Sequence, residues 1–138
     1  MNVRLAGPNV PPSLMSGFSA ATDHALVIPR DIHFDEKAGA VTAPVYLATM
    51  VPRRFFPGYR HSVQRAERAR LIIRNVTECS IRIDPAVTDQ EVELLFGVTL
   101  LPGGSIYFCS AQERHGHGQP CLEVEATVSV PDLEVSSE

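Results

Sequence analysis

The strongest constraint on the fold is a strict alternation of apolar and polar residues along several short segments. Residues 121–130 have apolar side chains at every second position: Leu122, Val124, Ala126, Val128 and Val130. Successive side chains of a β-strand point to opposite faces, so this pattern predicts a strand with one buried and one solvated face. The same alternation occurs at residues 79–84, where Cys79, Ile81 and Ile83 share a face.

Turn signals separate these segments at intervals of about 8 to 12 residues, a spacing typical of all-β domains. One of them, LPGGS at residues 101–105, is a tight-turn sequence between two expected strands. There are about eight short strand candidates and few helix candidates. The sequence therefore predicts an all-β fold, an antiparallel two-sheet β-sandwich of immunoglobulin-like or jelly-roll topology. The strand order stays open.

The segment 91–101 is expected to form a single strand. Its apolar residues at period two are Val92, Leu94, Phe96, Val98 and Leu100. A helix beginning with a capping box at Thr88 and Glu91 is the alternative. The β-branched and aromatic content of the segment, together with Gly97, favours the strand.

Three earlier segments are less regular. Residues 40–51 are rich in β-branched side chains but contain Pro44, which suits an edge strand or a break. Residues 53–62 are expected to form a loop around a Pro-Gly pair. The first half of 62–75 is compatible with a turn or two of helix, whereas its second half alternates as a strand does.

A chain of 138 residues is expected to form one domain that buries roughly two thirds of its unfolded surface. Residues 1–24 contain three prolines and show no period, so they predict an extended N-terminal arm. The β-sandwich domain is expected over residues 25–131, followed by an acidic C-terminal tail at 132–138. Such ends suit contact with neighbouring subunits, and an arm folded back on its own domain is the alternative that stays open.

The three cysteines are an odd number without a dense framework, which favours a reducing compartment. No run approaches the ~18 apolar residues of a membrane span, and the first residues lack the apolar stretch of a signal peptide. We therefore expect the protein to be synthesised in the cytoplasm and to have no membrane partner. A virion is the specific destination that we consider.

The segment ERHGHGQPC, residues 113–121, is the most chemically suggestive one. His115 and His117 are one residue apart, and Cys121 follows, which are ligand types that zinc prefers. Gly116 and Gly118 favour turn conformations rather than a rigid ligand platform, so an exposed hairpin tip is the main prediction. No phosphate-binding glycine loop and no nucleophile elbow occurs. We expect no cofactor, no catalytic residues and no enzymatic function, with a metal-dependent enzyme at His115 and His117 as the third hypothesis.

The charges are unevenly distributed. The chain has a net charge of −4, yet seven of its twelve basic residues lie between Arg53 and Arg74, opposed by Glu67 alone. If 67–75 and 79–84 are neighbouring strands, their arginines project from one sheet face. These arginines suit either plain solvent exposure or, with the aromatics of RRFFPGYR, contact with nucleic acid. An acidic domain disfavours a dedicated nucleic-acid binder.

A third explanation uses both signs of charge. Glutamates of the expected strands 91–101 and 121–130 also point outward, so a basic and an acidic stripe on different surfaces would be complementary head to tail. The candidate interface residues are Arg53, Arg54, Phe55, Phe56, Arg68, Arg70, Arg74, Arg82, Glu91, Glu93, Glu123 and Glu125. If the stripes share one sheet face, they form cross-strand pairs within one chain instead.

The sequence thus favours a structural or assembly protein, a β-sandwich subunit of a multi-copy particle. Its specific form is a virion component: a capsid decoration, minor capsid or tail-associated protein. The expected partners are further copies of the chain, a larger protein scaffold, or both. A ligand- or nucleic-acid-binding module that uses the Arg53–Arg74 surface is the alternative.

Overall fold

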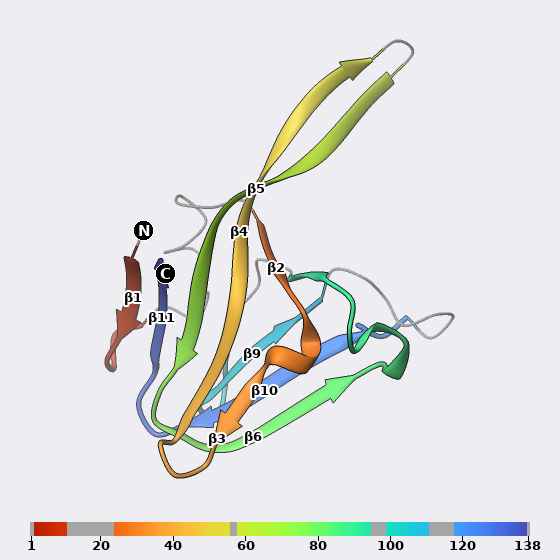
Figure 1. Ribbon diagram of the computed structural model, residues 1–138. Coiled ribbons are helices and arrows are strands. Elements are labelled where there is room, and N and C mark those ends of the chain that lie inside the picture. Colours follow the sequence, from red (N-terminus) through yellow and green to blue (C-terminus); the bar gives the residue numbers. More distant parts are fainter. Residues whose placement is uncertain (1, 11–23, 56–57, 95–98, 111–117, 138) are drawn as a thin grey trace.

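A computed structural model describes residues 2–10, 24–55, 58–94, 99–110 and 118–137. Over these residues the chain forms eleven β-strands and two 3-10 turns, with no α-helix. The strands make two antiparallel sheets (Figure 1). The prediction of an all-β two-sheet sandwich is confirmed.

The larger sheet has seven strands in the order β1-β11-β5-β4-β2-β7, with β3 also paired to β4. Their bounds are β1 Asn2–Ala6, β2 His24–Val27, β3 His33–Asp35, β4 Ala40–Phe55, β5 Gly58–Ile73, β7 Val92–Leu94 and β11 Asp132–Ser137. The smaller sheet has the order β6-β10-β9-β8. Its strands are β6 Val76–Ile83, β8 Thr99–Leu101, β9 Ser105–Cys109 and β10 Leu122–Val128, and the 3-10 turns are Pro29–Asp31 and Pro85–Val87.

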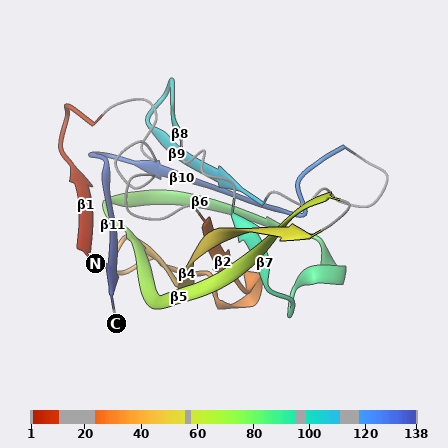
Figure 2. The same cartoon turned by 90° about the horizontal axis from the view of Figure 1, so that it is seen from above.

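The hydrophobic core lies between the two sheets, which Figure 2 shows as two layers. The larger sheet contributes Val41, Ala43, Val45, Leu47, Ala69, Leu71 and Ile73, among others. The smaller sheet contributes Ile106, Phe108, Leu122, Val124 and Ala126. In β9 and β10 every second residue is buried, as the alternation predicts. The one departure is Val130, which lies beyond the end of β10 and is 44% exposed.

The expected single strand at 91–101 is wrong. Its first part is β7 in the larger sheet, and its last part is β8 in the smaller sheet. Phe96 and Val98 lie outside the described residues. The alternation continues through both strands because the even-numbered residues of each strand face the shared core.

The β4–β5 hairpin replaces the expected loop at 53–62 and the helical turn after it. Both strands are 16 residues long and pair along their whole length, from Val41 opposite Ile73 to Phe55 opposite Gly58. Pro44 lies inside β4, at the point where the partner strand on one side of β4 changes. The pairing of β4 with β3 ends at Thr42, and its pairing with β2 begins at Val45. A residue without an N–H is tolerated at such a change of partner.

The chain ends also differ from the expected arm and tail. Residues 2–6 of the expected arm form β1, which pairs with β11 of the same chain, and 11–23 lie outside the described residues. Residues 132–137 of the expected tail form β11, which pairs with β1 on one side and β5 on the other. Leu133 and Val135 face the core, and their alternation explains why an acidic segment forms a strand.

A matched pair of valine truncations tests the position of the core. Val124 is fully buried on β10, whereas Val130 is exposed. Val124→Ala should lower the free energy of unfolding by about 2 kcal/mol, since it removes buried methyl groups and leaves a cavity. Val130→Ala should change it by less than about 0.5 kcal/mol. Urea unfolding measures both, and equal effects would contradict the assigned core.

Candidate interaction surfaces

The distal hairpin, defined as residues 48–55 and 58–66 of β4 and β5, extends away from the sandwich (Figure 1). The pairing of β2 with β4 ends at Ala48, and that of β11 with β5 ends at Ala69. Beyond these points the described residues of the two strands pair only with each other. A register shift lies at the base, where Leu47 is opposite Glu67 but Ala48 is opposite Arg65. Such a β-bulge bends and twists a strand locally.

The distal hairpin is the most basic part of the chain. Residues 48–66 include Arg53, Arg54, Arg60 and Arg65 and no acidic residue. Because the whole chain has a net charge of −4, the remaining residues together have −8. The register also places Arg53 directly opposite Arg60 and Arg54 opposite Tyr59. Of the candidate interface residues, Arg53, Arg54 and Phe55 belong to this hairpin, and Phe56 lies outside the described residues.

The other candidate arginines do not share one face. β5 and β6 belong to different sheets, so Arg68 and Arg70 lie on the larger sheet whereas Arg82 lies on the smaller one. The condition for a shared arginine face, that 67–75 and 79–84 are neighbouring strands, is therefore not met. Arg68 lies over the ring of Tyr46, with its guanidinium carbon 5.7 Å from the ring centre, which is a cation–π distance.

The candidate glutamates are divided between the sheets in the same way. Glu93 is on β7 beside Leu26, and Glu91 directly precedes that strand. Glu123 and Glu125 are on β10 in the smaller sheet. Arg82 is opposite Glu123, and their charged atoms are 3.9 Å apart. Each sheet thus has both positive and negative side chains outside the core. Positive and negative charges are separated most clearly between the distal hairpin and the rest of the chain.

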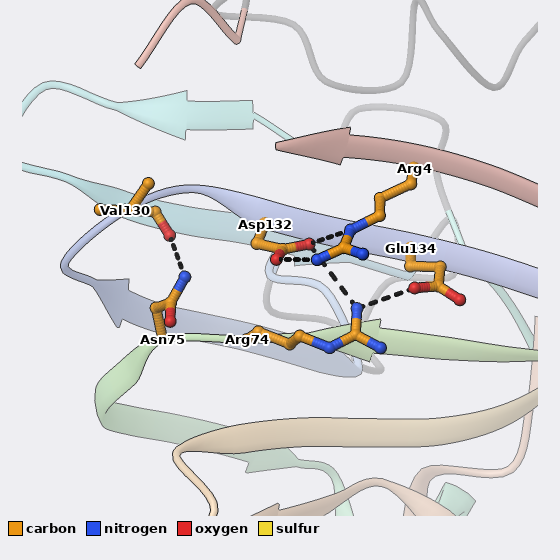
Figure 3. Close-up of polar contacts among 6 residues, drawn as sticks. All are labelled: Arg4, Arg74, Asn75, Val130, Asp132 and Glu134. Atoms are coloured by element: carbon orange, nitrogen blue, oxygen red, sulfur yellow. Dashed lines mark hydrogen bonds and ion pairs between the residues drawn. The ribbon is translucent and has the colours of Figure 1, made fainter. Parts of the chain in front are cut away.

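A second charged cluster joins the two ends of the chain (Figure 3). Arg4 donates from Nε to Oδ1 of Asp132 at 3.1 Å and from Nη2 to Oδ2 at 2.7 Å. Arg74 donates from Nη1 to Oε2 of Glu134 at 2.8 Å, and the same nitrogen is 3.6 Å from Oδ1 of Asp132. The hydrogen bonds from Arg4, together with the charges of both arginines, lower the pKa of the largely buried Asp132 carboxyl. We call these four residues the terminal clamp.

Sequence reasoning missed both features for different reasons. Arg4 and Asp132 are 128 residues apart, and no local pattern connects them. Arg60 and Arg65 were not singled out because their segment was expected to be a loop or a helical turn. The Pro-Gly pair between two aromatic residues was the signal that could have indicated a hairpin tip.

The metal hypothesis gains no support from the described chain. His115 and His117 lie outside the described residues. Cys121 is buried, and its Sγ lies 3.1 Å from Oγ of Ser110. No group of three or more potential ligands occurs among the residues that the structure describes.

The three cysteines are free thiols. Burial raises the pKa of Cys79 and is the main cause of the raised pKa of Cys109. Both thiols are therefore less ionised at neutral pH than an exposed cysteine, which makes them weaker nucleophiles. In the described part, no helix has the length and apolar character needed to cross a membrane.

Removal of the buried carboxylate tests the terminal clamp. The lowered pKa of Asp132 means that its contribution to stability is present above the unfolded-state pKa of about 3.9 and is lost as the pH falls through the native pKa. Asp132→Asn should lower the free energy of unfolding by about 1–2 kcal/mol at pH 7. The difference from the wild type should shrink below about pH 4.

The matched control for this variant is Asp89→Asn. Asp89 is 73% exposed and pairs with the exposed Arg30, so its loss should cost less than about 0.5 kcal/mol. Urea unfolding at several pH values measures both variants. A difference between Asp132→Asn and the wild type that persists unchanged to pH 2 would show that the carboxylate charge is not the stabilising feature.

Comparisons of the chain with models of known families, with curated proteins and with solved structures found no match. A proposal about function therefore has to rest on the distal hairpin, the sheet faces and the terminal clamp.

Proposed function

We propose that this chain is a structural subunit of a multi-copy assembly and that the distal hairpin is its main contact element. The observation that carries the proposal is the self-contained pairing of residues 48–66 beyond the sandwich. A two-stranded ribbon alone is marginally stable in water. A ribbon that extends roughly 25 Å from its domain therefore suits stabilisation by a partner.

The composition of the hairpin tip supports contact with protein. The sequence from Met50 to Tyr59 contains three aromatic residues, one methionine and two arginines. Aromatic residues, methionine and arginine are enriched at protein interfaces, and aromatic and arginine side chains dominate their binding energy. A hairpin of this composition, held out from a rigid sandwich, is a suitable means of joining subunits.

The specific form of the proposal is a virion component: a capsid decoration, minor capsid or tail-associated protein. Such a subunit needs a compact domain with an adhesive projection. The sandwich with its distal hairpin fits that description, and a large protein scaffold is the partner that this form of the proposal implies.

A second candidate function is contact with nucleic acid through the same hairpin. Four arginines without an acidic residue could neutralise phosphates, and a two-stranded β-ribbon fits the major groove of DNA. The charge of −8 on the rest of the chain would repel the backbone around the contact. We therefore rank this function second.

Replacement of residues 48–66 by an Asn-Gly turn tests the assembly function. Leu47 and Glu67 are directly opposite, so a two-residue turn can connect them. The shortened protein should unfold with a thermal midpoint close to that of the full chain, because the core ends before the deletion. It should be monomeric in light scattering, whereas the full chain from its native source should elute in a particle far above 15.1 kDa.

The control is Lys37→Ser, a change in the exposed turn between β3 and β4. This variant should assemble as the full chain does. A shortened protein that still enters the particle would disprove the role of the hairpin, and a full chain that is monomeric in native extracts would disprove the assembly function.

A further inference from the structure

We propose that the distal hairpin of one copy docks on the outer face of the smaller sheet of a second copy, with hairpin arginines against glutamates of β6 and β10. This inference rests on the assembly function proposed above and specifies its partner. It is carried by two concentrations of like charge, of opposite sign, in one chain.

The first concentration lies in the hairpin, where the register opposes two like charges. Arg53 and Arg60 are directly opposite in the antiparallel pair. Opposed residues of such a pair have Cβ atoms about 4.5–5.5 Å apart, and like charges there destabilise the pair. No acidic residue lies anywhere between positions 48 and 66 to compensate. An anionic group of a partner would relieve this repulsion.

The second concentration is an excess of glutamates on the outer face of the smaller sheet, although none of Glu78, Glu123 and Glu125 is directly opposite another. Glu123 and Glu125 are on the same side of β10, and Glu78 on β6 is diagonal to Glu125. Arg82 is the cation opposite Glu123. Within the described residues, neither Glu78 nor Glu125 has an ion-pair partner. This face would be stabilised by cations from outside.

The shape of this face also suits a docked ribbon. A shallow hollow of about 300 Å³ is lined by Glu78, Cys79, Ser80, Glu125 and Thr127. Beside it, Tyr107 donates a hydrogen bond to Glu123 at 2.7 Å, which helps to hold that carboxylate in place. A hairpin tip with arginine and aromatic residues matches a hollow rimmed by carboxylates.

Geometry favours a contact between copies over one within a copy. The hairpin continues the larger sheet, which forms a layer separate from the smaller sheet (Figure 2). The acidic face is the outer side of that smaller sheet. A projection of roughly 25 Å exceeds the Debye length of about 8 Å at physiological salt, so the tip is screened from the negative charge of its own domain. Contact between two different surfaces is heterologous, and its repetition gives rings or chains.

The first experiment is Arg53→Glu in the full chain, with self-association measured by sedimentation or light scattering. Position 53 is opposite Arg60 in the register, so the change turns a pair of like charges into a pair of opposite charges and the thermal midpoint should not fall. Self-association should weaken by about tenfold or more. Lys37→Glu makes the same charge change on an exposed turn and should leave self-association unchanged. A fall in the midpoint of Arg53→Glu would contradict the argument from the register.

The second experiment exchanges the two charges. A hairpin variant with Arg53→Glu and Arg60→Glu and a face variant with Glu78→Lys and Glu125→Lys should each lose self-association. Mixed together, they should form complexes again, because each has the surface that the other requires. Recovery on mixing supports a contact between copies, and its absence overturns it.

Other outcomes separate this inference from the function on which it rests. A purified chain that stays monomeric at all concentrations, yet needs its hairpin to enter the native particle, overturns docking between copies and leaves the assembly function intact. Fluorescence anisotropy with DNA and RNA oligonucleotides gives a further test. Binding that the Arg53→Glu change abolishes, with no self-association of the wild type, would overturn the inference in favour of nucleic acid.

Discussion

The antiparallel pairing of β4 with β5 is the constraint on which the rest of the structure depends, because the sandwich and the distal hairpin both use it. From Val41 to Leu47 and from Ala69 to Ile73 every second residue is buried. The next position of the buried series on β5 is Glu67, which accepts a hydrogen bond from Ser137. An apolar core does not continue past a carboxylate at such a position. The β-bulge lies directly beyond this position. The pairing of β4 with β5 continues past the bulge, whereas the core between the two sheets ends there.

The sequence predicted those parts of the fold in which one strand pattern stays in one sheet. β6, β9 and β10 fall where the alternation placed them, because burial on one face imposes period two along each strand. The run 91–101 has the same period but belongs to two sheets. Periodicity records which residues face the core and does not record which sheet they belong to. That limit also explains why Arg68 and Arg82 were expected on one face.

The distal hairpin and β11 show what else a local pattern cannot reveal. Proline, glycine and clustered arginines in 52–62 indicate a loop by composition, yet pairing with a strand of equal length makes this segment an extension of the sheet. β11 is short and acidic, and its Asp132 is tolerated in a nearly buried position because Arg4 approaches from the opposite end of the chain. In both cases the deciding partner is distant in sequence.

The terminal clamp fixes one end of the chain to its own domain. Val3 and Leu5 pack against the core while Arg4 holds Asp132, so β1 covers β11 and is the edge strand of its own larger sheet. Residues 2–6 of the expected arm are thus paired within their own chain. The distal hairpin, in contrast, is the described projection whose two strands pair only with each other.

The like charges in register bear on function because a stable monomer has no need of them. Residues that break a local rule concentrate at functional sites, where a gain elsewhere compensates for the cost. Here Arg53 and Arg60 of the hairpin are opposed like charges, and the outer face of the smaller sheet has more glutamates than cations. Within one copy the two groups belong to different sheets, and neither offsets the other. Between two copies, each group supplies the counter-charge that the other lacks.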